Sequence, residues 1–242
     1  MILRKVDTEK SVLRWGGLAG ILGGLIFILV FVIVGVFVGP DPAGAAGPVI
    51  RFPDIRAART LENGLYSLVL VLWVTHFLAL YRALRVTSLG PALFGSVLGV
   101  MGLGVLAAGA LPHVATARIS DLYHASGTTS EAKATLVLVW QATQGIFDAL
   151  LVAGLVFVPF GLVALGVAML PAPAFGKGFG GVSVGLGVVG VVAASALVVD
   201  PLSPIAPVGV LALIVFHLVL GWKVYSLSRA PVGTLHQVKP AG

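Results

Sequence analysis

The chain contains no cysteine and few charged residues. The absence of cysteine excludes disulfides, thiolate metal sites and thiol catalysis. Charged residues make up 10% of the 242 residues, whereas about a quarter of a soluble domain is charged. Hydrophobic residues make up 58%, more than a water-soluble fold can bury. The composition therefore indicates a membrane protein.

Several functional motifs are also missing. The sequence has no Walker loop, no H-E-x-x-H and no G-x-S-x-G. No lysine lies in the middle of an apolar run, as a retinal Schiff base would need, and no run carries the arginine row of a voltage sensor. The net charge of +6 is not gathered into a basic stripe. We therefore expect neither an enzyme nor a nucleic-acid-binding protein.

Six long apolar runs dominate the sequence. About 20 apolar residues cross a bilayer, and uninterrupted runs of this length must be helices, because backbone groups in lipid need internal partners. The sequence thus predicts an all-α, polytopic transmembrane helix bundle, folded as a single domain over 1–242, with external loops at 39–63 and 112–140. The predicted spans are 16–38, 64–82, 90–111, 141–169, 179–199 and 206–226. Asp200-Pro201 and Ser203-Pro204 predict a tight turn between the last two spans.

The fourth helix is predicted to be too long for the bilayer. Thr128 and Glu131 fit a capping box that starts a helix, and no break follows until residue 170. Such a helix would be about 63 Å long at 1.5 Å per residue. We expect one helix, kinked near Pro159, whose first turns project outside and which enters the membrane near Trp140.

Basic and aromatic residues indicate the orientation. The ends and loops on the side of the termini carry ten Lys and Arg, and the opposite side carries five. The positive-inside rule therefore predicts a multipass protein of the plasma membrane with both termini cytoplasmic. Aromatic residues gather at that same interface, as in an aromatic belt: Trp15, Tyr81, Trp222 and Tyr225.

Small residues recur at helical spacing in three spans, and such faces let helices approach closely in lipid. We expect them to pack inside the bundle, with a homo-oligomer or another membrane subunit as the alternative. The faces are Gly16/Gly20/Gly24, Gly95/Gly99 and Gly181/Gly185.

Few polar residues fall within the spans, and these form the candidate intramembrane site: His76, Gln141, Gln144, Asp148 and His217. Gln141, Gln144 and Asp148 share one helical face, and a carboxylate in lipid should turn toward the bundle interior. This predicts a contact with a neighbouring helix, His76 and His217 being the nearest ionisable candidates. Asp148 is then either a proton or cation site or a structural hydrogen-bonding group.

The two histidines lie at comparable depths. Axial histidine pairs bind haem in some membrane cytochromes, but an interhelical hydrogen bond for each histidine is the simpler interpretation. Outside the spans, His113, Asp121 and His124 are too scattered for the three or four ligands that zinc needs, so no metal site is expected. Arg51, Arg56 and Arg59 are predicted to form a solvent-exposed face of the first external loop, with anion binding as the alternative.

The C-terminal part resembles bacterial families of six-span membrane proteins of unknown function. The resemblance rests on Phe179-Gly-Gly after Pro171-Ala-Pro173, on Asp200-Pro201, and on the ending Leu220–Arg229. It covers about a quarter of the chain and implies no activity. The sequence as a whole favours a non-enzymatic binding or packing module, such as an accessory subunit of a membrane complex. The alternative is a small proton-coupled transporter that uses Asp148.

The predicted topology is testable with reporter fusions. A reporter after Gly242 and a second one near Arg56 should lie on opposite sides of the membrane, because an odd number of spans separates them. Alkaline phosphatase and green fluorescent protein activities measure this. Two reporters in the same compartment would show that the number of spans is wrong.

Overall fold

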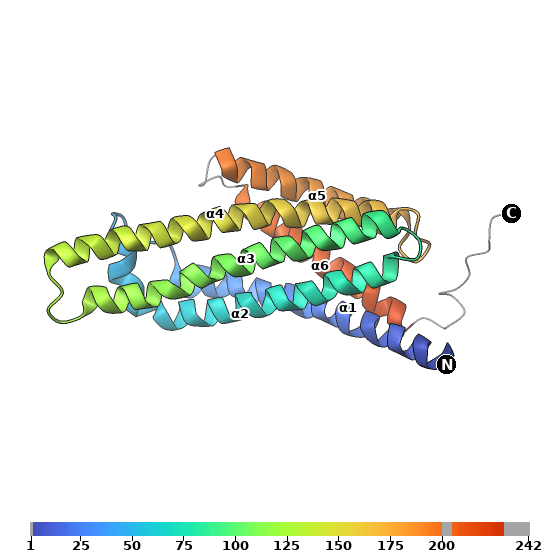
Figure 1. Ribbon diagram of the computed structural model, residues 1–242, viewed down its shortest axis with the longest axis horizontal. Coiled ribbons are helices and arrows are strands. Elements are labelled where there is room, and N and C mark those ends of the chain that lie inside the picture. The colour runs from blue at the N-terminus through green and yellow to red at the C-terminus, as the bar shows by residue number, and fades with distance from the viewer. Residues whose placement is uncertain (1, 200–204, 230–242) are drawn as a thin grey trace.

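The computed structural model describes residues 2–199 and 205–229, and every regular element in this part of the chain is helical (Figure 1). Each of the six α-helices is long and apolar enough to cross a membrane, which confirms the all-α bundle. The predicted turn at 200–204 lies outside the described residues. The helices are α1 (Ile2–Ile33, extended by the π-helix η1, Val34–Val38), α2 (Gly47–Leu84), α3 (Leu89–His124), α4 (Ser130–Met169), α5 (Gly176–Val199) and α6 (Ala206–Ser228).

The helices form a closed ring. Each helix packs against its neighbours in the chain, and α1 packs against α6, while α2, α4 and α6 also touch across the middle. The start of α1 and the end of α6 lie at the same end of the bundle (Figure 1). This arrangement follows from an even number of antiparallel helices; the compartment of that end remains a prediction.

Local signals explain most helix boundaries. Gly39, at φ 63°, ends η1, and its N–H donates to the Val34 carbonyl. Pro48 lies in the first turn of α2, where a missing N–H costs nothing. Thr129 caps α4, since its Oγ1 accepts a hydrogen bond from the Ala132 N–H at 3.2 Å. The cap is therefore one residue later than the predicted Thr128.

Most of both predicted external loops is helical, which corrects the sequence-based boundaries. Helix α2 begins at Gly47 and α3 continues to His124, so α2, α3 and α4 have 38, 36 and 40 residues. The charged residues of these segments were interpreted as loop residues, but a helix outside lipid carries them readily. Residues 47–62, 112–124 and 130–148 of the three long helices are called the projection below, and in Figure 1 the α3–α4 hairpin extends well past α5.

Helix α4 is uninterrupted from Ser130 to Met169, as predicted, with no reverse turn between Gln141 and Asp148. The depth of Trp140 relative to the membrane stays a prediction, but the structure shows that this side chain faces the interior of the protein. Its side chain is buried and packs edge-on against Phe52, with ring centroids 5.5 Å apart. Trp140 thus belongs to a small apolar core of the projection, together with Val49 and Ile119.

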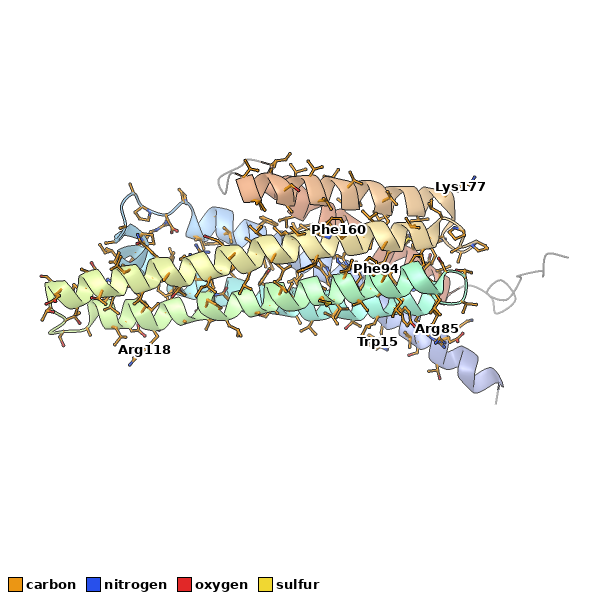
Figure 2. The ribbon with its side chains drawn as sticks, turned by 45° about the horizontal axis from the view of Figure 1, so that its top comes forward. Trp15, Arg85, Phe94, Arg118, Phe160 and Lys177 are labelled. Carbon is orange, nitrogen blue, oxygen red and sulfur yellow. The ribbon has the colours of Figure 1, made fainter. Side chains whose placement is uncertain are left out.

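At the end where α1 begins, Trp15 is 67% exposed beside basic residues. Figure 2 shows Trp15 and Arg85 at this end, with Lys177 of α5 also there, whereas Arg118 lies near the opposite end. Trp222 of α6 is exposed as well. Exposed tryptophans beside basic residues are typical of a membrane interface.

Glycines bring the helix backbones into contact. A Cβ on Gly161 of α4 would lie 2.7 Å from the Gly95 carbonyl oxygen of α3, and a Cβ on Gly95 would lie 2.8 Å from the Gly161 oxygen. A Cβ on Gly16 of α1 would likewise overlap the Ala79 side chain of α2, and a Cβ on Gly24 would lie 2.7 Å from Leu218 of α6. The small faces predicted for the first and third spans are therefore packing faces.

The prediction that Gly181 and Gly185 of the fifth span pack inside the bundle is wrong, and the alternative of a partner face there stays a prediction. A Cβ on Gly181 or Gly185 would meet nothing within 4 Å. Helix α5 instead packs on α4 through Gly180, Gly187 and Gly190, where a Cβ would lie 2.6–3.0 Å from α4 atoms. Glycine occurs on several faces of this helix, so spacing alone did not identify the packed one.

The two kinds of glycine predict opposite effects of alanine. Gly161→Ala should force α3 and α4 apart and destabilise the protein by about 1–3 kcal/mol. Gly185→Ala, on the open face, should leave stability unchanged or raise it, since alanine favours a helix by about 1 kcal/mol over glycine. Thermal unfolding in detergent measures both, and equal melting temperatures would contradict the close α3–α4 contact.

Candidate functional site

The structure brings together two of the predicted site residues at the centre of the bundle. His76 of α2 and His217 of α6 are both 0% exposed. Their ring centroids are 5.1 Å apart, and the rings are inclined by 63°. The comparable depths inferred from the sequence therefore correspond to a direct contact.

Aromatic rings and one glycine surround this pair. Trp73 stacks on His217 with centroids 4.0 Å apart and an interplanar angle of 7°, and Phe77 and Phe216 meet His217 edge-on. A Cβ on Gly20 of α1 would lie 2.7 Å from His76 Nδ1. Gly20 therefore provides the space that the His76 ring occupies.

Hydrogen bonding at this centre is incomplete. His76 Nδ1 lies 2.9 Å from the Gly16 carbonyl oxygen of α1. Because a carbonyl oxygen can only accept, Nδ1 carries the proton and donates this hydrogen bond. His76 Nε2, both nitrogens of His217 and Trp73 Nε1 are buried without a partner among the described residues. The predicted interhelical hydrogen bond is thus present for His76 and absent for His217. An unpaired buried polar atom costs about 1–3 kcal/mol and calls for an explanation.

The packing of this centre does not fit haem. A porphyrin between the two imidazoles would have to replace their 5.1 Å contact and open the stack with Trp73. Nor do other ligands converge here, because no three His, Cys, Asp or Glu side chains gather anywhere in the described part of the chain. The centre is a closed aromatic and imidazole cluster.

The other candidate residues lie elsewhere. Asp148 and Gln141 are exposed, and Gln144 is half-buried. Asp148 has no hydrogen bond or ion pair with any described residue. The expectation that Asp148 turns toward the bundle interior and contacts a neighbouring helix is therefore wrong.

The short fifth helix explains the position of Asp148. Leu197, near the end of α5, lines a small apolar cavity together with Leu155 of α4. Asp148 lies seven residues farther along α4, about 10 Å beyond that level. The apolar run of 141–169 is longer than a membrane span, and its first part has no α5 beside it.

The arginines of the first external segment are largely occupied. Arg51 donates to the carbonyls of Val38 and Pro40, and Arg56 forms a two-bond ion pair with Asp121 at 2.7 and 3.1 Å. These bonds from Arg56 hold the pKa of Asp121 below its ordinary value. Neither the alternative of an anion site made of all three arginines nor a cluster of His113, Asp121 and His124 is formed.

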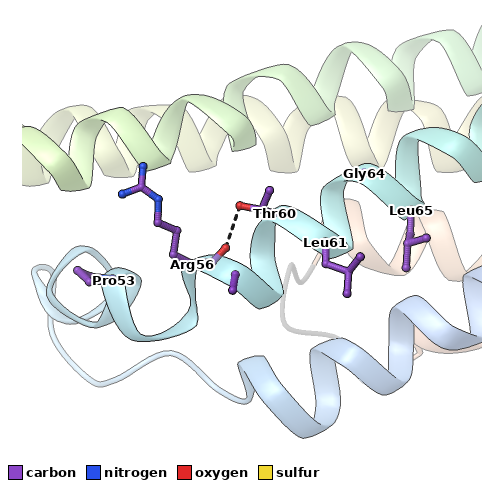
Figure 3. Close-up of a pocket in the computed structure, with 7 residues that line it drawn as sticks. Pro53, Arg56, Thr60, Leu61, Gly64 and Leu65 are labelled. Atoms are coloured by element: carbon purple, nitrogen blue, oxygen red, sulfur yellow. Dashed lines mark hydrogen bonds between the residues drawn. The ribbon is translucent and has the colours of Figure 1, made fainter.

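The structure contains a crevice, lined in part by polar side chains, that the sequence analysis missed. It lies between α2 and α3 at the base of the projection, has a volume of about 210 Å³, and is lined by Arg59, Thr60, Asn63, Ser67 and His113 among others. Arg59, Asn63 and Ser67 are spaced by four residues and form a helical stripe. It went unnoticed because Arg59 and Asn63 were assigned to the predicted loop 39–63, whereas Ser67 was assigned to the following span. A shallower groove on α2 adjoins it (Figure 3).

Figure 3 shows that the side chains lining this groove point to opposite sides of α2. Arg56 points toward α3, where it meets Asp121, whereas Leu61 and Leu65 point to the opposite side. The Thr60 hydroxyl donates to the Arg56 carbonyl at 2.9 Å (Figure 3). Thr60 and Gly64 line both the groove and the crevice.

No protein-family model, no curated protein and no solved structure matches the chain. The resemblance of the C-terminal part to six-span families therefore stays a prediction. The site must be interpreted from its own geometry.

Because Asp148 is exposed, we expect that replacing its carboxylate has little effect on the stability of the protein. Asp148→Asn and Asp148→Leu should each change the free energy of unfolding by no more than about 0.5 kcal/mol, as for other exposed positions. Thermal unfolding in detergent measures this. A loss of several degrees with leucine but not with asparagine would instead reveal a buried hydrogen bond to Asp148.

Proposed function

We propose that this chain is a non-enzymatic multipass protein of the plasma membrane that acts as a binding module or accessory subunit, through its projection. The observation that carries the proposal is a contrast between two polar places. The His76–His217 pair is sealed inside the bundle, whereas the α2–α3 crevice at the base of the projection is accessible.

The packing of the apolar part supports a role other than transport. Glycine contacts hold α3, α4 and α5 backbone to backbone. The cavity between α4, α5 and α6, lined by Leu155, Pro159 and Ala194 among others, is apolar and closed. A path for a solute needs polar lining and room for water, and this cavity offers neither.

The projection also presents apolar side chains beyond the end of α5. Leu138 is 65% exposed, and Val139 and Ile146 on the same helix are exposed as well. Apolar surface outside lipid favours a protein partner. Another membrane subunit or a second copy of this chain would cover this flank of α4.

The unpaired nitrogens at the centre of the bundle favour a second candidate function, proton-coupled transport. Four buried nitrogens of His76, His217 and Trp73 have no partner among the described residues, and ionisable groups within a membrane bundle often belong to proton pathways. A proton-coupled transporter would therefore use the histidine pair, not Asp148.

The two functions predict different results in proteoliposomes. Under a pH gradient, the binding module should produce no proton flux above that of protein-free vesicles, measured with an enclosed pH-sensitive dye. His217→Phe should keep or raise the melting temperature, because phenylalanine preserves the ring packing and removes two unpaired nitrogens. A flux that His217→Phe abolishes would overturn the proposal in favour of transport.

A photo-crosslinking residue tests the partner directly in the native membrane. At position 138 it should yield a protein adduct, either to another subunit or to a second copy. At position 101, an exposed methionine on α3, the same residue should react with lipid only and serves as the control. Lipid adducts alone at position 138 would contradict a partner on this flank.

A further inference from the structure

The α2–α3 crevice carries free hydrogen-bonding groups from both helices. Arg59 donates one bond, from Nη1 to Glu62 at 2.9 Å, which leaves the other guanidinium nitrogens without a partner among the described residues. The Asn63 side chain has no described partner either. The hydroxyls of Thr60 and Ser67 donate to backbone carbonyls of their own helix, so their oxygens remain available as acceptors.

His113 makes this crevice more than a surface depression. It is 7% exposed, lines the crevice, and its Nδ1 is buried without a hydrogen-bond partner in the described residues. Phe147 of α4 packs edge-on against the ring, with centroids 4.8 Å apart, which fixes its position. A buried imidazole with an unpaired nitrogen at the wall of an open crevice points to a ligand.

The depth of the crevice matches a lipid headgroup. Leu106 of α3 packs at Gly154 of α4, close to the level at which Leu197 of α5 meets Leu155. His113 is seven residues farther along α3, about 10 Å toward the projection. Helix α5 continues to Val199, about 3 Å past Leu197, so His113 lies about 7 Å beyond the last described residue of α5. The headgroup layer outside an apolar core that ends there is about 5–8 Å deep. The crevice therefore opens at the level of the headgroups.

The apolar surface on the membrane side of the crevice fits acyl chains. Val71 lies one helical turn from Ser67, and Leu111 lies one turn from Val114, which also lines the crevice. Both Val71 and Leu111 are largely exposed. A lipid with its headgroup in the crevice would lay its chains along these residues.

The charges around the crevice nearly cancel. Arg59 is paired with Glu62, and both side chains are mostly buried. The charges of Arg59 and Asp41 act on His113 with opposite sign. Glu62 and Asp41 do not line the crevice itself, but a doubly charged free phosphate bound there would lie near their carboxylates without full compensation of its own charge. A zwitterionic headgroup, with a phosphodiester and an ammonium group, matches the local balance.

We infer that the α2–α3 crevice binds the headgroup of a zwitterionic phospholipid. Arg59 and Asn63 donate to the phosphodiester oxygens, and the carboxylates near the crevice favour the ammonium group. The acyl chains follow Val71 and Leu111 into the bilayer. This inference rests on the proposed function only in placing the projection outside the bilayer, and it requires no protein partner.

Lipid binding to the purified full chain in detergent tests the inference. Native mass spectrometry should show one phosphatidylethanolamine retained preferentially over phosphatidylglycerol. Asn63→Leu and Arg59→Gln should each weaken this binding about tenfold, as expected for the loss of one hydrogen bond to a charged group. Arg118→Gln, which removes an exposed arginine of α3 outside the crevice, is the matched control and should bind as the unmodified chain does.

Unchanged melting temperatures would show that the Asn63 and Arg59 variants remain folded, and Asn63→Ser provides a milder variant if either is unstable. Equal lipid retention by all variants would overturn the inference, as would equal weakening by Arg118→Gln or a preference for phosphatidylglycerol. Binding of water-soluble glycerophosphoethanolamine as tightly as the lipid would also overturn it, because the acyl chains would then play no part. These outcomes are independent of crosslinks at position 138 and of proton flux.

Discussion

The close approach of helix backbones at glycine is the constraint on which the rest of this structure depends. In a bilayer, apolar side chains gain little by leaving lipid for protein, so helices associate mainly through packing and hydrogen bonds. Here a Cβ on Gly95, Gly161 or Gly166 would lie 2.7–2.8 Å from the backbone of a neighbouring helix. These contacts fix the distances between α3, α4 and α5, whereas α2, α4 and α6 meet across the centre of the ring.

The polar centre is a consequence of the same constraint. On α1, Gly20 and Gly23 face the rings of His76 and Trp73, where a Cβ would lie 2.6–2.9 Å from ring atoms. The glycine face of α1 therefore does more than admit a neighbouring helix, since it makes room for a histidine and a tryptophan that would otherwise not fit. This is why the His76–His217 contact is tight and closed to water.

Much of this fold could be predicted from the sequence, because a bilayer imposes length and apolarity on every span. The six helices and the packing faces at Gly16 and Gly95 follow from that rule and from helical spacing. The packed face of α5 could not be predicted, since its glycines occupy several faces. The depth of Asp148 could not be predicted either, because it depends on where a different helix, α5, ends. The crevice was missed because Arg59 and Asn63 lie in a charged segment, and charge does not distinguish a loop from a helix that has left the membrane.

The His76–His217 pair and the α2–α3 crevice differ in whether a ligand can reach them from outside the bundle. The nitrogens of His217 are enclosed by Trp73, Phe77 and Phe216, so a ligand could reach them only if helices separated, and the glycine contacts oppose that separation. Their cost of about 1–3 kcal/mol each must be offset by the packing of the rings around them. His113 has the same kind of unpaired nitrogen, but its ring borders a crevice that is open to the surface. A ligand can reach this place without any helix moving, and so it is the crevice, not the buried pair, that is suited to binding.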